Sequence, residues 1–407
     1  MMESDDMVND MERPAPLEGL LVVDLTRALA GPFCAMTLGD LGADVVKIEE
    51  PGVGDDSRHW GPPFAGGESA YFLSCNRNKR SVALNLKSEE GREALWRLVE
   101  RADVLIENFR PGVVARLGFD YEAARERNPR LIYCSISGFG QDGPEAHRVA
   151  YDLILQGMSG ATYLTGDPNG PPMRNGLPVS DLFAGMFALQ AILTALYTRE
   201  RTGHGQRVET TLLGATVAAL GTYASSYFVT GEPPTRFGNS HPQIAPYDLM
   251  RTSDGYVNIA GANDDVWLRL CAALDLEALT DDPRFRTNAD RVRNRPELLP
   301  LLEARTTQFT SVELLARLEE ARVPAGPIRD LAQVFNSPQA RHLGLEQVQA
   351  HPTAGEVHTV AAPFTFSEND LALRRPPPTL GQHTEEVLRE LGYDDATLAR
   401  WRTEGVI

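Results

Sequence analysis

The 407-residue chain has few cysteines and few positive charges, and both shortages exclude classes of function. Its four cysteines, Cys34, Cys75, Cys134 and Cys271, form neither a disulfide pattern nor a metal-ligand spacing. They are typical of free thiols in a reducing compartment. Lys and Arg number 39 against 56 Asp and Glu, which gives a formal net charge of −17. That charge argues against a nucleic-acid partner and against binding to an anionic membrane surface.

Signatures of several enzyme classes and of export are also missing. Thr26-Arg-Ala-Leu-Ala-Gly-Pro32 follows the first strand-like run in place of Gly-x-Gly-x-x-Gly, which disfavours nicotinamide and flavin enzymes. No Gly-x-Ser-x-Gly elbow indicates a serine hydrolase, and no His/Cys/Asp/Glu spacing indicates a metal site. The apolar runs look too short for a membrane span, and the acidic start, Met1 to Asp6, does not resemble a signal peptide. We therefore expect a cytoplasmic protein with no metal and no membrane partner.

The composition that is present, 42% hydrophobic and 23% charged residues, is that of a globular protein too long for one core. Short apolar runs of the buried-strand type alternate with helix-compatible segments through the first third of the chain. Strands are predicted over 20–25, 44–49, 81–86, 103–107, 130–136 and 207–212, and helices over 33–41 and 89–100. This alternation predicts the α/β class, with a doubly wound, Rossmann-like parallel sheet and right-handed crossovers.

Changes in composition along the chain predict its domains. We expect a disordered tail over 1–16, a large α/β domain over 17–229 and a smaller α+β domain over 230–330. Residues 331–407 would return to the large domain and end in a helix over 385–392. The smaller domain would contain helices over 296–305 and 311–321 and a strand over 256–259, and 355–360 is strand-like. The polar, Gly/Pro-rich connection over 56–80 has the length of a functional loop.

One charged residue stands at the start of an apolar stretch. Asn175-Gly-Leu-Pro-Val-Ser-Asp181 leads into an apolar run that ends near Thr198, which predicts a buried helix with Ser180 as its N-cap. Asp181 would lie in the first turn, where the dipole and free N–H groups keep a carboxylate ionised and weakly basic. Such a carboxylate can attack an activated acyl group and form a mixed anhydride. Helix capping is the commoner role for a residue in this position, and both roles stay open.

Basic residues gather in one window despite the acidic background. The six are Arg77, Lys79, Arg80, Lys87, Arg110 and Arg116. At the strand ends of an open α/β sheet, such a cluster suits a nucleotide with several phosphates, although a solvated basic face has the same composition. Asn108 and Phe109 could offer an adenine ring an amide and a stacking face, or Phe109 could be a core aromatic.

Two further positions could carry chemistry. Tyr151-Asp152 precedes an apolar helix, which makes Asp152 another capping candidate. His241 lies in a loop between two proline-containing turns, where a histidine is more often a surface residue than a catalytic one.

Ten short motifs, in order, resemble those of the class III CoA-transferases, the formyl-CoA and carnitine CoA-transferase type. They are Leu17-Glu-Gly-Leu-Leu-Val-Val-Asp-Leu-Thr26, Ala30-Gly-Pro32, Leu41-Gly-Ala-Asp-Val-Val-Lys-Ile-Glu49, Asn78-Lys-Arg-Ser81, Glu107-Asn-Phe-Arg-Pro-Gly112, Tyr133-Cys-Ser-Ile-Ser-Gly-Phe-Gly140, Tyr151-Asp152, Asp181-Leu-Phe-Ala-Gly185, Thr202-Gly-His-Gly-Gln206 and Gly238-Asn-Ser-His-Pro242. The resemblance spans residues 17 to about 330 and is weaker afterwards. The 2-methylacyl-CoA racemases share that fold.

The resemblance implies coenzyme A as co-substrate and Asp181 as the nucleophile, with no metal or ATP. It places Leu84, Lys87, Asn108, Phe109 and Arg116 along the CoA nucleotide and Arg110 near its phosphates. It also places Tyr151 and Asp152 in the CoA site, and it implies a homodimer of two interlocked subunits.

Departures from the family pattern narrow the expected chemistry. Leu29 stands where formyl-CoA transferases have glutamine, and Gly238 to Tyr247 replaces their glycine-rich loop, so formyl and oxalyl groups are disfavoured. The His241-Pro form is similar to relatives that use dicarboxylic acyl groups, which makes His241 a substrate-binding candidate and a dicarboxylate the expected partner. The racemases have a His-Asp pair where this chain has Tyr151-Asp152, and tyrosine, with a pKa of about 10, exchanges an α-proton poorly. A transferase moving CoA from an acyl-CoA to a carboxylic acid is therefore favoured over a racemase or a non-catalytic CoA-binding protein.

Overall fold

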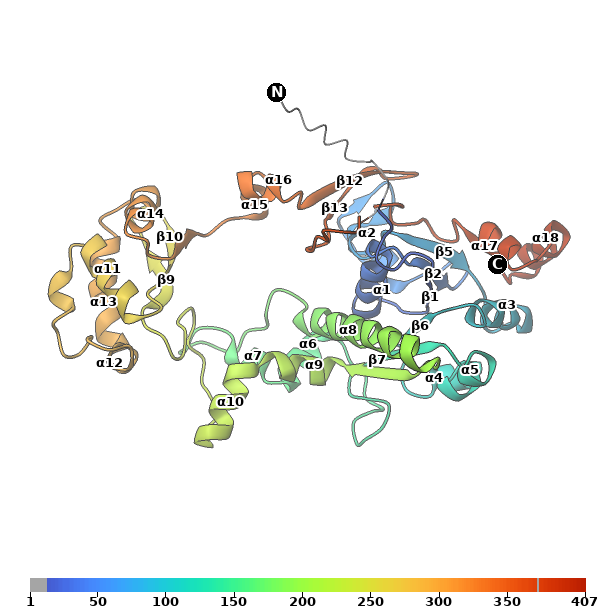
Figure 1. The fold of residues 1–407 in the computed structure, drawn as a ribbon, viewed down its shortest axis with the longest axis horizontal. Coiled ribbons are helices and arrows are strands. Elements are labelled where there is room, and N and C mark those ends of the chain that lie inside the picture. Colours follow the sequence, from blue (N-terminus) through green and yellow to red (C-terminus); the bar gives the residue numbers. More distant parts are fainter. Residues whose placement is uncertain (1–12, 372) are drawn as a thin grey trace, which may run out of the picture. The chain divides into compact units, whose positions relative to one another are not determined.

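The computed structural model describes residues 13–371 and 373–407. Most of the predicted disordered tail over 1–16 lies outside these residues. The chain folds into two compact units (Figure 1). Unit 1 contains Met1–Ala161, Asn175–Ala224 and Arg341–Ile407, and unit 2 contains Thr162–Arg174 and Ser225–Ala340.

Unit 1 is built on a six-stranded sheet in which every pair of neighbours is parallel. From edge to edge its strands are β5 (Lys79–Ala83), β2 (Asp44–Glu49), β1 (Leu21–Asp24), β6 (Val104–Glu107), β7 (Ile132–Ser137) and β8 (Arg207–Thr211). The strand order reverses between β1 and β6, which is the switch point of a doubly wound fold. The predicted α/β class with a central parallel sheet is confirmed.

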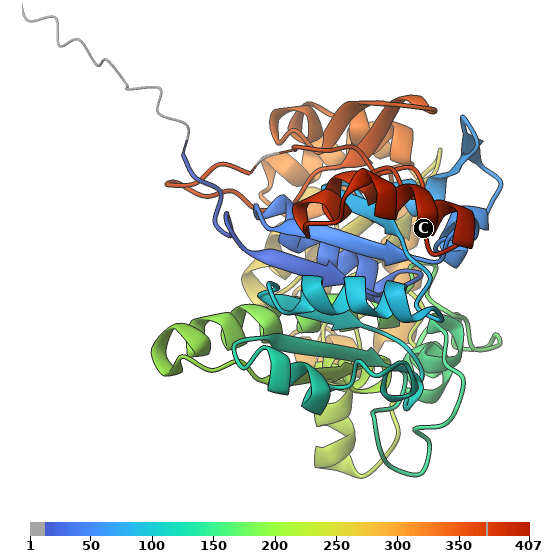
Figure 2. The same ribbon diagram turned by 90° about the vertical axis from the view of Figure 1, so that its right-hand side faces the viewer.

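Helices cover both faces of this sheet because successive strand residues point to opposite sides. Val23 belongs to one core with α3 (Glu89–Val99), α17 (Thr384–Glu390) and α18 (Asp395–Glu404), the side that faces the viewer in Figure 2. The neighbouring Val22 belongs to the other core, which contains α1 (Ala30–Asp40), α8 (Val179–Thr202) and α9 (Leu212–Ala219). Unit 1 also contains α4 (Val113–Leu117), α5 (Tyr121–Arg127) and α6 (Asp152–Met158), while α7 (Ala161–Leu164) and α10 (Gly221–Thr230) include residues of both units.

The C-terminal segment covers the free edge of the sheet at β5. The Asn78 N–H donates to the Arg375 carbonyl at 2.9 Å, and the His383 N–H donates to the Ser81 carbonyl at 2.9 Å. The Ala83 N–H donates to the Thr384 hydroxyl at 2.9 Å. An exposed edge strand is a template for unwanted pairing, and this segment occupies the groups that would make it.

Unit 2 contains a three-stranded antiparallel sheet in the order β11 (Ala325–Pro327), β10 (Tyr256–Ala260), β9 (Tyr247–Arg251). Val257 and Ile259 point into a core with Trp267, while Tyr256 and Asn258 are exposed. Its helices are α11 (Asp264–Ala273), η2 (Glu277–Leu279), α12 (Asn288–Arg293), α13 (Arg295–Thr306), α14 (Ser311–Glu320), α15 (Leu331–Phe335) and α16 (Pro338–His342). The helices predicted over 296–305 and 311–321 correspond to α13 and α14.

Several predicted element bounds were wrong. The connection over 56–80 contains η1 (Asp56–His59), β3 (Phe64–Ala65), β4 (Glu68–Ser69), α2 (Ala70–Ser74) and the start of β5. Elements this short contain too few residues for a periodic pattern to appear. The chain also continues past α17 into α18, which Asp394 caps by accepting the Thr397 N–H.

The strand predicted over 355–360 has the predicted bounds. It is β13 (Gly355–Val360), which pairs with β12 (Glu346–His351).

Helix α8 overturns the expectation that every apolar run is too short for a membrane span. By length and composition it could cross a membrane, and α9 and α10, bent by 74°, pass the same test as a pair. A core helix passes this test equally, so the finding is weak evidence for a span. In unit 1, α8 supplies Ala184, Ala188 and Ile192 to the core that it shares with α1.

A glycine allows α8 to lie directly against α1. A Cβ at Gly185 would stand 2.6 Å from the Ala30 carbonyl oxygen and 3.2 Å from the Phe33 ring. We expect Gly185→Ala to lower the free energy of unfolding by about 1–3 kcal/mol, because backbone must move to admit the methyl group. Gly157→Ala is the matched control, since a Cβ there meets nothing within 4 Å and alanine favours a helix. Urea unfolding followed by circular dichroism measures both, and equal midpoints for the two variants would contradict the prediction.

Candidate active site

The carboxyl ends of the central strands open on a cavity of about 590 Å³ that belongs entirely to unit 1. We name it the Asp181 cavity; its lining includes Ala28, Leu29, Asp56, Trp60, Tyr71, Asn108, Phe109, Arg110, Gly138, Arg148, Tyr151, Asp152, Pro178 and Asp181. This edge of the sheet is where ligands bind in doubly wound folds.

A second cavity of unit 1, about 110 Å³, shares two wall residues with the first. Arg27 and Phe109 line both cavities. We name the smaller one the Leu84 cavity; its other lining residues are Leu25, Ile48, Glu49, Glu50, Leu84, Asn85, Leu86, Lys87 and Leu117. The two cavities are therefore neighbours along the strand ends. The smaller has an apolar wall with two cations and two glutamates, and the larger has three aspartates and three arginines.

The start of α8 delivers Asp181 to its cavity. Pro178 is the N-cap residue and supplies no side-chain cap, and Asp181 lies in the first turn as predicted. The prediction that Ser180 caps this helix was wrong, because Ser180 lies inside the helix and is fully buried. The cap comes from Asp152, whose Oδ1 accepts the Ser180 N–H at 2.9 Å. Asp152 therefore caps α8, which is distant in sequence, and not α6, the helix that begins at Asp152.

This arrangement changes the expected ionisation of Asp181. Burial and the nearby Asp152 carboxylate raise the pKa of Asp181 to about 7. The expectation that the helix start keeps Asp181 a weak base is therefore wrong, because burial and the Asp152 charge outweigh the effect of the helix start. Burial and the Asp181 carboxylate also raise the pKa of Tyr71, so its hydroxyl stays protonated beside the cavity.

Buried charges hold the turn after β1 that forms one wall of the cavity. The Asp24 carboxylate, fully buried, accepts the Thr26 N–H at 2.9 Å and pairs with Lys79 Nζ at 2.9 Å. Lys47 Nζ donates to the Thr26 carbonyl at 2.6 Å and pairs with Asp55 at 2.9 Å. Asp55 in turn accepts the N–H of Ala28 at 3.1 Å. Ala28 has a φ of +68°, so these bonds fix a strained residue in the wall.

The same contacts correct the interpretation of the basic window. Arg77, Lys79 and Arg80 are buried and paired with Asp40, Asp24 and Asp44, so they serve the fold and not a ligand. Lys79 and Arg80 also begin β5, at the opposite end from the strands' carboxyl edge.

The other three cations of the window are accessible. Lys87 lines the Leu84 cavity and pairs with Glu50 at 2.9 Å. Arg110 is exposed and lines the Asp181 cavity. Arg116 is exposed on α4 beside Leu117, which lines the Leu84 cavity.

Arg27 and Phe109 line both cavities, and Asn108, which lines only the Asp181 cavity, holds Arg27 in place. The Asn108 amide donates to the Arg27 carbonyl at 2.8 Å and accepts the Arg27 N–H at 2.9 Å, which fixes Arg27 between them. The Phe109 ring packs on the core and lines both cavities, with the Arg27 guanidinium 6.0 Å from its centroid. Phe109 thus acts both as a core aromatic and as a ring face at the cavity wall.

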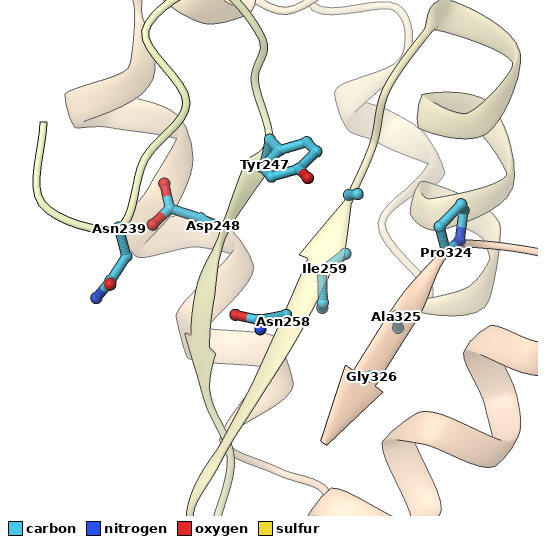
Figure 3. A pocket seen from close by; sticks show the side chains of 9 residues that line it. Asn239, Tyr247, Asp248, Asn258, Ile259, Pro324, Ala325 and Gly326 are labelled. Atoms are coloured by element: carbon cyan, nitrogen blue, oxygen red, sulfur yellow. The ribbon is translucent and has the colours of Figure 1, made fainter. Parts of the chain in front are cut away.

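His241 belongs to unit 2. Its N–H donates to the Tyr247 carbonyl at 3.1 Å, and its Nδ1 accepts the Gln243 N–H at 3.1 Å. A cavity of about 260 Å³ lies beside the sheet of β9, β10 and β11. It is lined by Asn239, Tyr247, Asp248, Asn258, Ile259, Ala260, Pro324, Ala325 and Gly326 (Figure 3). The His241 ring lies 5.4 Å from the Tyr247 ring that lines this cavity.

Sequence reasoning missed several lining residues of the Asp181 cavity. Arg148, Trp60 and Tyr71 carry the chemistry most relevant to a polar ligand, and the Trp60 and Tyr71 rings meet edge to face at 4.9 Å. Both aromatics come from the 56–80 connection, whose length was the available signal. Among residues 13–371 and 373–407, no group of three or more His, Cys, Asp or Glu is placed to hold a metal ion.

A carboxylate cavity joined to a second cavity with Lys and Arg at its wall agrees with the resemblance drawn from the motifs. The model of CoA-transferase family III matches residues 17–384. The chain belongs to CoA-transferase family III. The family predicted from the sequence is thus confirmed.

Similar proteins cover nearly the whole chain. Succinyl-CoA:glutarate CoA-transferase of Mus musculus is 42% identical over 400 residues, 98% of this chain and 92% of that protein. Acetyl-CoA:oxalate CoA-transferase of Acetobacter aceti is 46% identical over 385 residues, 94% and 97% of the two chains. The crystal structure of a CAIB/BAIF family protein from Brucella suis matches with a TM-score of 0.83 at 45% identity, covering 93% of this chain and all of that one.

The ionisation of Asp181 can be tested directly. We expect its carboxyl to titrate near pH 7, and we expect Asp152→Asn to lower that midpoint, because a neighbouring negative charge is removed while burial stays. Carbon-13 NMR of labelled aspartate carboxyls measures both, with Asp181→Asn for assignment. Asp56→Asn is the control, since it removes an exposed carboxylate from the same cavity and should leave the midpoint in place. An unchanged midpoint in Asp152→Asn would contradict the coupling.

Proposed function

We propose that this protein transfers CoA from an acyl-CoA to a carboxylic acid through an anhydride on Asp181. The observation that carries the proposal is that two neighbouring cavities share the wall residues Arg27 and Phe109, with Asp181 in the larger one. A CoA ester is long, and its nucleotide end and its thioester end need such separate sites joined along one path. The distance between the ends is bridged by the flexible pantetheine arm.

The Leu84 cavity has the chemistry for the nucleotide end. Leu84, Leu86 and the Phe109 ring offer apolar surface to an adenine ring, and Lys87 and Arg27 offer charge to phosphate oxygens. Arg110 would receive the diphosphate on the way to the Asp181 cavity, with Arg116 nearby on α4. The thioester carbonyl would then reach Asp181, beside Tyr151 and Asp152.

The proposed reaction conserves the thioester. The ionised Asp181 oxygen attacks the acyl carbonyl, the carbon–sulfur bond breaks, and CoA thiolate leaves an aspartyl anhydride. The thiolate attacks the aspartyl carbonyl, which releases the donor acid and leaves an aspartyl-CoA thioester. The acceptor carboxylate attacks that thioester and forms a second anhydride. The CoA thiolate expelled in that step then attacks the acyl carbonyl of the second anhydride, which releases the new CoA ester and restores Asp181.

The surroundings of Asp181 support this chemistry. Partial burial limits the access of water, which would hydrolyse an anhydride. The raised pKa of Asp181 makes its carboxylate a better nucleophile than an exposed one, while still ionised in good part near neutral pH. Backbone N–H groups of the glycine-containing loops would hold the tetrahedral oxyanion.

We further propose that the two units are the CoA-binding domain and the smaller domain, and that two chains interlock as a homodimer. Exposed apolar side chains support a partner: α8 presents Met186, Phe187 and Tyr197, and α9 presents Val217. The four cysteines are free and buried, which fits the proposed cytoplasmic location.

Dicarboxylic acids are the proposed substrate class. The Mus musculus relative is named for succinyl-CoA and glutarate, and the Acetobacter aceti relative for oxalate. Arg27, Arg110 and Arg148 line the Asp181 cavity and can balance a second carboxylate there. His241 is the candidate from unit 2 for contact with the acid.

The nucleophile is tested by substitution and trapping. We expect Asp181→Asn and Asp181→Ala to lose at least about 10³-fold in transfer rate while CoA still binds, because the acyl group has no oxygen to accept it. Hydroxylamine added during turnover should convert Asp181 of the wild-type protein to a hydroxamate, detected by mass spectrometry. Transfer by either variant at a rate near wild type, or α-hydrogen exchange of a 2-methylacyl-CoA in D₂O without an acid, would contradict the proposal.

The substrate class is tested with a panel of acids. We expect succinate and glutarate to give higher kcat/KM as acceptors from an acyl-CoA than monocarboxylates of equal length, since a second carboxylate can pair with an arginine of the Asp181 cavity. Liquid chromatography of the CoA esters measures each pair. Equal rates for butyrate and succinate would exclude recognition of a second carboxylate.

A further inference from the structure

Gln156 is a buried glutamine on α6 with no part in the reaction proposed above. Its side chain has no exposed surface, and it does not contribute to the lining of the Asp181 cavity. The Nε2 group donates to Asp152 Oδ2 at 2.7 Å and to the Leu177 carbonyl at 3.0 Å. The Oε1 atom accepts the Asn175 N–H at 2.8 Å. Both amide hydrogens and the carbonyl oxygen are therefore used, as expected for a buried polar group.

These bonds all act on the segment that leads into α8. The chain returns to unit 1 at Asn175, and α8 begins at Val179. Between these points the segment is mostly exposed, with Leu177 63% exposed, so packing does little to hold it. Asn175 and Leu177 are bonded to Gln156, and Ser180 is bonded to Asp152. We name Gln156 and Asp152 the α6 clamp.

We propose that Gln156 is a positioning residue that, through the α6 clamp, sets where Asp181 stands in its cavity. Asp181 directly follows Ser180, the last residue that the clamp holds. Gln156 also orients Asp152, because its Nε2 group occupies one carboxylate oxygen and leaves the other for the Ser180 N–H. The inference rests on the proposed function of Asp181 and adds a residue that touches no substrate.

A clamp of this kind affects the reacting step more than substrate binding. The nucleotide end of CoA is assigned to the Leu84 cavity, whose lining comes from other strand ends and not from α6 or α8. Loss of the clamp would leave the Leu84 cavity intact and allow the first turn of α8, with Asp181, to shift its position. A displacement of about 1 Å at a reacting group costs roughly 100-fold in rate. The expected signature is a lower kcat with little change in CoA binding.

The test uses Gln156→Met, which keeps the length of the side chain and removes all three hydrogen bonds. We expect kcat to fall roughly 100-fold, with the dissociation constant of CoA within about threefold of wild type. Gln339→Met is the matched control, because Gln339 is an exposed glutamine on the short helix α16, away from the lining of either cavity. Its kinetics should equal those of wild type.

A second pair of variants guards against misfolding of Gln156→Met. Asn175→Pro removes the N–H that Gln156 accepts, whereas Asn175→Ala keeps it, and both lie at an exposed position. Both also lose the side-chain bond to the Leu177 N–H, so that bond does not contribute to the difference between them. We expect kcat of the proline variant to fall at least about tenfold below that of the alanine variant.

Hydrogen exchange separates failure of this inference from failure of the proposed function. Loss of the clamp should speed exchange of the Ser180 amide in Gln156→Met, whatever reaction the protein catalyses. Normal protection of Ser180, or a kcat within about threefold of wild type in both Gln156→Met and Asn175→Pro, overturns the inference. Parallel loss of kcat and of CoA binding overturns it as well, since that result marks a general structural role. If the wild-type protein transfers no CoA, the proposed function fails alone and the exchange result still decides the clamp.

Discussion

The buried ion pairs of Lys79 with Asp24 and of Lys47 with Asp55 are the constraint on which the site depends. All four side chains lack solvent exposure, so each charge is tolerable only because its partner is in place. The second carboxylate oxygen of Asp24 accepts the Thr26 N–H, and that of Asp55 accepts the Ala28 N–H, both in the turn after β1. The shape of the cavity wall is therefore coupled to the integrity of the core, and the wall residue Ala28 keeps a backbone conformation that it would not adopt alone.

The two cavities lie along the same edge of the sheet but draw their lining residues from different elements. Apolar side chains, accessible cations and two glutamates lie at the ends of β1, β2 and β5, while Asp152 and Asp181 stand where α6 and α8 begin. Arg27 and Phe109 join the two, and Asn108 fixes Arg27 by both of its amide atoms. In the proposed function, positions at the switch point of the sheet would serve both ends of one CoA ester.

Much of the fold could be predicted from the sequence because its strands are short apolar runs, and β2 and β13 have the bounds predicted for them. The position of Asp181 in the first turn of α8 could be predicted from the apolar run that follows it, whereas its role as nucleophile came from the family resemblance and stays a prediction. What could not be predicted depends on contacts between distant residues. Nothing local shows that Arg77, Lys79 and Arg80 pair with Asp40, Asp24 and Asp44. Nor does it show that Asp152 caps α8, or that burial and the Asp152 charge raise the pKa of Asp181.

The covering of β5 by the C-terminal segment has a consequence for biosynthesis. Thr384, which accepts the Ala83 N–H, is made 301 residues after its partner. Until that segment leaves the ribosome, the β5 edge of the nascent sheet is unpaired, and other chains can add to it. A chain truncated before this segment would keep an edge strand that is prone to aggregation.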